Sequence, residues 1–504
     1  EEKIPFRPES LAAISRTDLT DRNGKVLATD LDAASLFVDA RKVWNAEEAT
    51  DALLSVLPML DRAQTYKKMT SGQAFVWLHR DLTPRQQDAV HRLGFPFLGF
   101  RREPHRVYPH GRLASHILGY VDTDNHGLAG IERGLERTIA DPRRLDEPVV
   151  LSIDVRVQHA LQDELMRAME TFQAIGAAGV VMNANTGEIA AMASLPDFDP
   201  NDPMGSPPEA RFNKTTLGVY EMGSTFKTFT TAMVLDAGKA TLSTKYDARR
   251  PLTYGRFKIS DFHAQNRILT TEEVFEHSSN IGSARMALSV GISGHRAFLG
   301  KLGLLQPMPF EVSETGRPMV PARWGELQSV TISYGHGIAV NPVQVVAATS
   351  AMVNGGTLFH PTLVKLKPGE TPKGARAISP ETSEKMRRLL RLVVEKGTGG
   401  KADVPGYPVG GKTGTAEKPA AGGYAETSLL TSFVAAFPAA KPDYVVVVIL
   451  DEPKPTKDTF GFATAGWTAA PTAGKVIARI APLLNVPVSP VAQRLRTAAA
   501  APPP

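Results

Sequence analysis

Two predicted β-hairpins, far apart in the chain, most constrain the fold that this sequence can adopt. Short apolar runs flank turn residues at 179–193 and again at 432–450, which is typical of paired antiparallel strands. Apolar residues at helical spacing occupy 155–171 and 226–235. Helices that cluster around strands paired by hairpins indicate an α+β domain, with a mostly antiparallel sheet flanked by helices.

The first third of the chain has a less regular pattern. An Asn-Gly turn at 21–24 predicts a hairpin, and amphipathic patterns predict helices over 46–66 and 83–93. The sequence is polar at 140–148 and apolar again at Val149, which favours a boundary there. We therefore predict a domain without catalytic motifs over 1–149, a second domain over 150–487, and an Ala/Pro-rich disordered tail over 488–504.

Composition excludes several classes of function. The chain has 504 residues, of which 42% are hydrophobic and 22% charged, the profile of a globular protein with two or three domains. The net charge is +5 without a continuous basic stripe, so no nucleic-acid partner is expected. The absence of cysteine excludes thiol catalysis, disulfides and zinc–thiolate sites.

A membrane segment is expected outside this sequence. No run approaches the roughly 18 apolar residues of a membrane span. The sequence starts with Glu1 and not with Met, and we expect a signal or a single anchor helix to precede it.

The first of three short polar motifs is Ser224-Thr225-Phe226-Lys227, at the start of an apolar helical pattern. Residues i and i+3 of a helix share a face, so the Lys227 amine is expected to reach the Ser224 hydroxyl. Serine is a good nucleophile only when a base takes its proton, and burial with a nearby cation lowers a lysine pKa enough for that task. Alone, the motif more often marks a capped helix start.

The second motif is Ser278-Ser279-Asn280, after a helical run at 271–277. The Ser278 hydroxyl can relay a proton between a lysine and a leaving group, and the Asn280 side chain can hold a substrate amide. Alone, such a sequence is typical of a loop or a helix cap.

The third motif is Lys412-Thr413-Gly414-Thr415. A lysine and a hydroxyl on the edge strand of a sheet can bind a carboxylate, and the unpaired edge backbone can pair with an extended peptide. Gly414 leaves the edge clear for close approach. Alone, the motif also fits a polar turn.

Together and in this order, the three motifs mark serine β-lactamases and penicillin-binding proteins. The chain resembles class B penicillin-binding proteins, and within them the division-specific penicillin-binding protein 3 type. The resemblance covers nearly the whole chain, with Met222 where proline is expected. It rests on DRNGKVLA (21–28), FVWLHRDLTP (75–84), RVYPHGRLASHILGYVD (106–122), GLAGIE (127–132), LSIDVRVQ (151–158), YEMGSTFK (220–227), FEHSSNIG (275–282), SYGHGIAVNPVQ (333–344), GTGG (397–400), GKTGTAEK (411–418) and LDEPK (450–454).

This resemblance implies a role for each motif. Ser224 is expected to be the acylated nucleophile, with Lys227 as its base, and the backbone amides of Ser224 and Thr415 are expected to form the oxyanion hole. The implied catalytic residues are Ser224, Lys227 and Ser278, and the implied substrate-binding residues are Asn280, Lys412, Thr413, Gly414 and Thr415. No metal or cofactor is expected.

The resemblance also implies an architecture, a substrate and partners. The domain over 1–149 is expected to be an elongated pedestal of the dimerisation type, followed by a transpeptidase domain that cross-links peptidoglycan stem peptides ending in D-Ala-D-Ala. β-Lactams are expected to acylate it. A polytopic membrane glycosyltransferase and other division proteins are the implied partners, on the periplasmic side of the inner membrane. An elongation-type role stays open, because the choice rests on resemblance alone.

Rival functions have weaker support in the sequence. The segment 406–413 matches the phosphate-binding pattern G-x-x-x-x-G-K-T, but such a loop lies between a strand and a helix. Neither flank, 399–405 nor 414–423, has the required pattern. A β-lactamase of class A deacylates through a glutamate motif that we do not find. The 12 histidines form no H-E-x-x-H pair, and His336 is expected in a loop or cleft wall.

Overall fold

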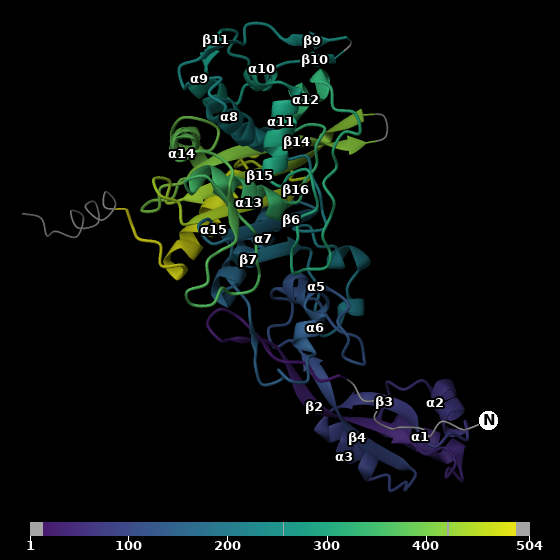
Figure 1. Ribbon diagram of the computed structural model, residues 1–504. Helices are drawn as coiled ribbons and strands as arrows, with labels where there is room; N and C mark the ends of the chain where they lie inside the picture. The colour runs from purple at the N-terminus through teal and green to yellow at the C-terminus, as the bar shows by residue number, and fades with distance from the viewer. Residues whose placement is uncertain (1–13, 256, 421–422, 490–504) are drawn as a thin grey trace, which may run out of the picture.

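The larger part of the molecule is built on a five-stranded sheet in the order β14-β15-β16-β6-β7, in which all neighbours are antiparallel (Figure 1). The computed structural model describes residues 14–255, 257–420 and 423–489, so nearly all of the predicted disordered tail lies outside the described residues. The strands are β6 (Gly176–Asn183), β7 (Ile189–Leu195), β14 (Gly410–Ala420), β15 (Gly423–Phe437) and β16 (Tyr444–Asp451).

The two predicted hairpins are confirmed and lie side by side in this sheet. They are β6–β7 and β15–β16, and they join through β16 and β6 along their full length. Segments remote in sequence thus form the centre of one sheet. This arrangement leaves β14, which carries the third motif, at the edge.

Helices cover both faces of the sheet, which explains why every residue of β16 except the last is buried. One face packs against α7 (Val155–Phe172) and α15 (Ala469–Leu483). The other packs against α13 (Pro342–Val353), all of whose residues are buried, and includes α8 (Lys227–Asp236) in its core. The predicted helix over 155–171 is confirmed, and Asp154 caps its start.

Smaller elements complete this part of the molecule. The remaining helices are α9 (Thr271–Glu276), α10 (Asn280–Val290), α11 (Ile292–Lys301), α12 (Glu326–Ile332) and α14 (Pro380–Glu395), with short turns η2 (Pro203–Gly205), η3 (Pro208–Arg211), η4 (Gly223–Phe226) and η5 (Gly400–Ala402). Three two-stranded ribbons pair β8 (Lys245–Asp247) with β11 (Ile268–Thr270), β9 (Leu252–Tyr254) with β10 (Phe257–Ile259), and β12 (Thr357–Phe359) with β13 (Gly374–Arg376).

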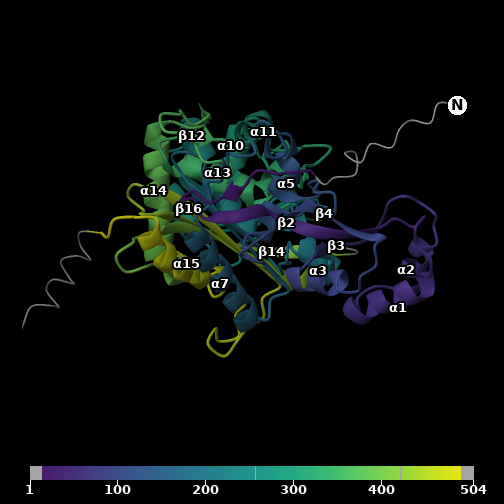
Figure 2. The same cartoon turned by 90° about the horizontal axis from the view of Figure 1, so that it is seen from below.

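A long antiparallel ribbon projects away from this sheet (Figures 1 and 2). It consists of β2 (Val26–Val38) and β4 (Leu98–Val107), which pair from Thr29↔Val107 to Val38↔Leu98. β3 (Val76–Leu82) adds to β2. At the far end, these strands pack with α1 (Ala46–Val56), α2 (Arg62–Met69) and α3 (Pro84–His91) into an outer lobe with its own small core.

One helix expectation in the outer lobe is wrong. The segment 46–66 forms α1 and the first part of α2, with a break between them at Leu57–Asp61. Pro58 disfavours a continuous helix, and the Asp61 side chain accepts a hydrogen bond from the Gln64 amide as the cap of α2. The predicted helix at 83–93 is confirmed as α3, with a capping box formed by Thr83 and Gln86.

The base of the ribbon is continuous with the core under the sheet. The Asn-Gly turn joins β1 (Leu19–Thr20) to β2 as predicted, and β1 pairs in parallel with β5 (Val149–Val150). Residues of α4 (Ser115–Leu118), α5 (Gly130–Gly134) and α6 (Glu136–Ile139) share one hydrophobic core with β6. The boundary predicted after 149 stays a prediction, and β5 lies across it.

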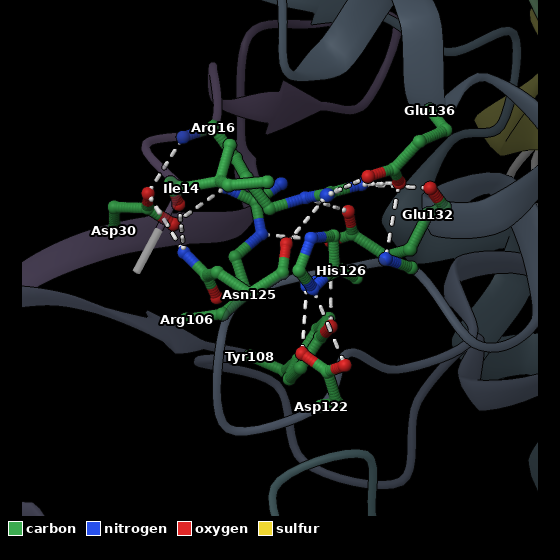
Figure 3. Close-up of polar contacts among 11 residues, drawn as sticks. Ile14, Arg16, Asp30, Arg106, Tyr108, Asp122, Asn125, His126, Glu132 and Glu136 are labelled. Atoms are coloured by element: carbon green, nitrogen blue, oxygen red, sulfur yellow. Dashed lines mark hydrogen bonds and ion pairs between the residues drawn. The ribbon is translucent and has the colours of Figure 1, made fainter. Parts of the chain in front are cut away.

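A buried cluster of charges fastens this base (Figure 3). The Glu132 carboxylate accepts from Arg16 Nε at 2.8 Å and from Arg106 Nε at 2.7 Å, and all three side chains have no exposed area. Glu136 and Asp30 each pair with one of the two arginines. Buried charges are tolerated only when they are paired. The cluster therefore holds the start of the described chain, β4 and α5 together.

We predict that Glu132→Ala destabilises the fold by about 3–5 kcal/mol, because it leaves two arginines buried without their shared carboxylate. Urea unfolding measures the change. Asp51→Ala is the control, since it removes an ion pair with Arg62 in which both side chains are more than half exposed, and it should leave the midpoint unchanged. An equal midpoint for both variants would contradict the structural importance of the cluster.

Candidate active site

The first motif forms a short 3-10 turn that leads into a buried helix. Ser224 lies in η4, and α8 begins at Lys227. Lys227 is 1% exposed, whereas Ser224 is only partly buried. The Lys227 ammonium Nζ lies 2.9 Å from Ser224 Oγ, so the i, i+3 contact predicted from the sequence is present. The Ser224 hydroxyl is therefore accessible to a substrate, whereas the Lys227 amine beside it is buried.

The second motif is the junction between α9 and α10. Ser278 has φ +57°, in the left-handed region. The amides of Ser278 and Ser279 donate to the carbonyls of Phe275 and Val274, the hydrogen-bond pattern of a Schellman helix end. Glycine is the usual residue at that position, and a serine there costs roughly 1–2 kcal/mol. Ser279 then caps α10 through the Gly282 amide.

Strand β14 brings the third motif to the same point. Lys412 is fully buried and its Nζ lies 3.0 Å from Ser278 Oγ. Lys227 Nζ lies 3.0 Å from the same oxygen and 2.6 Å from the Ser278 carbonyl oxygen. Ser278 therefore bridges the two lysines, and one connected path of polar atoms runs from Ser224 to Lys412.

Burial controls the charge of both lysines. It lowers the pKa of the Lys412 ammonium to about 7. Burial also lowers the pKa of Lys227 well below the ordinary lysine value, and the charge of Lys412 lowers it further. A buried ammonium loses its hydration, and a second cation beside it disfavours the charged form again. Lys227 is therefore able to act as a base near neutral pH.

Two glycines allow the first and third motifs to approach each other closely. A Cβ atom on Gly414 would lie 2.3 Å from the Met222 carbonyl oxygen. Gly223 has φ +52°, and a Cβ there would lie 2.6 Å from the Thr415 carbonyl oxygen. Side chains at either position would separate the strand from the serine turn. The role predicted for Gly414, to leave the strand edge clear for a substrate, stays a prediction.

Thr413 and Thr415 of the third motif make further contacts, one of them with Thr398, to which the sequence analysis gave no role. Thr398 Oγ1 lies 2.6 Å from Thr413 Oγ1, and Thr415 Oγ1 accepts from the Ala465 amide at 3.1 Å. Thr398 belongs to the GTGG segment, whose match to the family pattern was the available signal. These contacts restrict the side-chain orientations of Thr413 and Thr415.

A groove of about 970 Å³ lies next to this cluster, lined by Asn280 of the second motif and by Ala416–Lys418, the part of β14 that follows the third motif. Asn280 contributes to its wall, and its side-chain amide donates to the Ser260 carbonyl at 2.9 Å. His336 lies in the same wall, as expected, with its Nδ1 3.4 Å from the Glu221 carboxylate. The other lining residues include Phe257, Met319, Tyr334, Ala416 and Lys418. The groove has room for an extended peptide alongside β14.

The structure also bears on the phosphate-binding loop that the sequence analysis weighed and rejected. Lys412 and Thr413 lie inside strand β14, whereas a phosphate-binding loop continues into a helix, so the rejection of that function is confirmed. In the part of the chain that the structure describes, no three His, Asp or Glu side chains are grouped to hold a metal ion. Within the same residues, no helix has the length and apolarity needed to cross a membrane.

Two family models match this chain. The model of the penicillin-binding protein transpeptidase domain matches residues 177–476. The model of the penicillin-binding protein dimerisation domain matches residues 12–140. Together they cover both the sheet-based part and the projecting ribbon with its outer lobe.

Individual known proteins are similar over most of the chain. The probable peptidoglycan D,D-transpeptidase FtsI of Caulobacter vibrioides is 45% identical over 482 residues, which cover 94% of this chain and 82% of that protein. The probable peptidoglycan D,D-transpeptidase PenA of Neisseria meningitidis is 31% identical over 477 residues, covering 89% and 81%. Penicillin-binding protein 3 of Mycobacterium tuberculosis, solved with aztreonam, shares the fold with a TM-score of 0.74 at 24% identity, covering 95% and 98%.

We predict that the side-chain amines of Lys227 and Lys412 titrate far below the ordinary lysine range, with Lys412 at about 7. NMR of the chain labelled at lysine Cε measures both, and Lys227→Arg and Lys412→Arg assign the two resonances. Lys441→Arg, at the exposed β15–β16 turn, is the control and should leave both titrations in place. Two resonances with ordinary pKa values would refute the burial argument.

Proposed function

This chain belongs to the penicillin-binding protein transpeptidase family, and we propose that it cross-links peptidoglycan stem peptides through an acyl-enzyme on Ser224. The observation that carries the proposal is the contact of the buried Lys227 amine with the accessible Ser224 hydroxyl at 2.9 Å. A nucleophile beside a base of lowered pKa is the arrangement that covalent acyl transfer requires.

The donor peptide reacts first. Neutral Lys227 takes the Ser224 proton as Oγ attacks the carbonyl carbon of the penultimate D-Ala, and a tetrahedral oxyanion forms. We place that oxyanion between the backbone amides of Ser224 and Thr415, where preorganised donors stabilise it. The C–N bond then breaks, and the terminal D-Ala leaves as an amine after it receives a proton.

Ser278 is suited to deliver that proton. Its hydroxyl lies 3.0 Å from both Lys227 Nζ and Lys412 Nζ, so a proton taken by one lysine can pass through it to the leaving nitrogen. The amine of an acceptor peptide then attacks the ester carbonyl, loses a proton to the same base, and releases Ser224. The cross-link is a new amide bond, and no water or cofactor is consumed.

Substrate binding follows the edge strand. Backbone groups of β14 offer a template for an extended peptide, and Gly414 lets the serine turn lie directly against this strand. We assign the substrate carboxylate to Thr413 and the positive field of Lys412, and the peptide amide to Asn280 in the groove wall. A β-lactam fits the same site, where its ring amide is opened by Ser224 and stays attached as the acyl group.

The outer lobe is the proposed docking surface for other division proteins. It carries no catalytic motif and lies at the far end of the β2–β4 ribbon (Figure 1). Trp44, Met59 and Tyr66 of this lobe are 66%, 52% and 42% exposed, and large apolar side chains left in contact with water favour a protein partner where they form a patch. We place this chain on the periplasmic side of the inner membrane, beside a polytopic glycosyltransferase that supplies nascent strands.

We predict that a fluorescent penicillin adds one acyl group per chain, on Ser224, and that Ser224→Ala abolishes it. Mass spectrometry of the labelled peptide identifies the residue. Ser243→Ala, at an exposed position, is the matched control and should label like the parent. Lys227→Arg keeps a positive charge but supplies no neutral amine, and we expect a loss of acylation greater than tenfold. A label on another serine would refute the assignment.

We predict that Trp44→Ala with Met59→Ser and Tyr66→Ser leaves penicillin labelling of Ser224 unchanged but fails to restore septal growth in cells that lack the parent protein. Met166→Ser, an exposed position on α7, serves as the control and should restore growth. Full rescue by the triple variant would show that this surface is dispensable.

A further inference from the structure

The Ser278–Asn280 junction depends on a contact outside the three motifs. Asp261 lies in the segment between β10 and β11. Its Oδ2 accepts from Ser279 Oγ at 2.7 Å, and its Oδ1 accepts from the Ile281 amide at 2.9 Å. One carboxylate therefore holds the capping residue and an N-terminal amide of α10 together, where a negative charge is favoured.

The residue before Asp261 extends the same clamp. The carbonyl oxygen of Ser260 accepts from Asn280 Nδ2 at 2.9 Å. Successive residues of one segment thus fix three successive residues of α10 and its cap, namely Ser279, Asn280 and Ile281. This clamp lies directly after the left-handed Ser278, whose hydroxyl contacts both lysines.

The strained turn explains why such a clamp is needed. A serine at φ +57° gains conformational freedom if the helix junction relaxes. Relaxation would rotate the Ser278 hydroxyl and carbonyl away from Lys227, which they contact at 3.0 and 2.6 Å. By holding Ser279 and Ile281, Asp261 therefore also holds the Ser278 hydroxyl in place for proton transfer.

Asp261 also acts on the base through its charge. Burial is the largest cause of the low pKa of Lys227; the charge of Lys412, from β14, lowers this pKa further, and the charge of Asp261, from the β10–β11 segment, raises it. Burial alone accounts for the low pKa of Lys412. Removal of the Asp261 charge is thus expected to move the titration of Lys227 and not that of Lys412.

We propose that Asp261 is a positioning residue of the transpeptidase reaction, which locks the Ser278–Asn280 junction against the two lysines and sets the charge balance at Lys227. It does not contact the reacting atoms and acts through Ser279, Ile281 and Lys227. The inference rests on the proposed function of Ser224.

Rates of acylation by a fluorescent penicillin, measured from about pH 5 to 9 with the full chain, test the proposal. Asp261→Asn keeps an acceptor oxygen for the Ile281 amide and removes the charge. We expect the highest acylation rate of this variant to stay within about threefold of the parent rate. The acid limb of its pH–rate profile should move to lower pH, because loss of the Asp261 charge lowers the pKa of Lys227. Asp261→Ala removes both contacts, and we expect its plateau rate to fall at least tenfold.

Asp61→Asn is the matched control, since Asp61 also caps a helix but lies in the outer lobe, and it should leave both the limb and the plateau unchanged. A parent-like plateau rate in Asp261→Ala overturns the proposal, and so does an unshifted acid limb in Asp261→Asn. If Asp261→Ala does not fold, Asp261→Asn decides alone. The parent chain is measured first. If the penicillin does not label its Ser224, the proposed function fails, and this outcome is distinct from a failure of the Asp261 proposal.

Discussion

Two buried lysines that share one serine hydroxyl are the constraint on which the site depends. Lys227 and Lys412 both lie 3.0 Å from Ser278 Oγ and have almost no exposed area. Burial removes water from both amines and lowers the pKa of each, and the charge of Lys412 lowers the pKa of Lys227 further. The energy of folding thus holds a lysine amine of lowered pKa next to Ser224.

The sheet supplies the rigid side of this arrangement. β14 is the edge strand, and its register with β15 sets how far Lys412 reaches toward Ser278. On the other side, the serine turn η4 touches β14 through glycine, where a Cβ atom has no room. A hydrophobic core on each face fixes sheet and helices relative to each other, which is how a cluster of three motifs keeps hydrogen-bond distances.

The β2–β4 ribbon and the outer lobe are stabilised in a different way from the sheet. A two-stranded ribbon alone is marginally stable in water, so its base is merged into the core under the sheet and fastened by the Arg16–Glu132–Arg106 cluster. The outer lobe needs only a small core of its own. The result is a lobe held at the far end of the ribbon, away from the sheet that carries the three motifs.

The sequence by itself determined most local elements and the contact within the first motif. Turn residues and apolar runs predicted both hairpins and α7, and the i, i+3 spacing of Ser224 and Lys227 predicted their contact, because such signals act between near neighbours. The single helix expected over 46–66 failed where Pro58 and a capping Asp61 outweighed apolar periodicity.

Only the tertiary structure decided what lies between remote segments. The pairing of β16 with β6, the bridge from Lys227 through Ser278 to Lys412, and the clamp from Asp261 to Ser279 join residues with no periodic relation in the chain. Burial is likewise a property of the packed molecule, and burial is what lowers the pKa of the two lysines. A sequence specifies which groups are available, whereas their desolvation and separation are set by packing across the whole core.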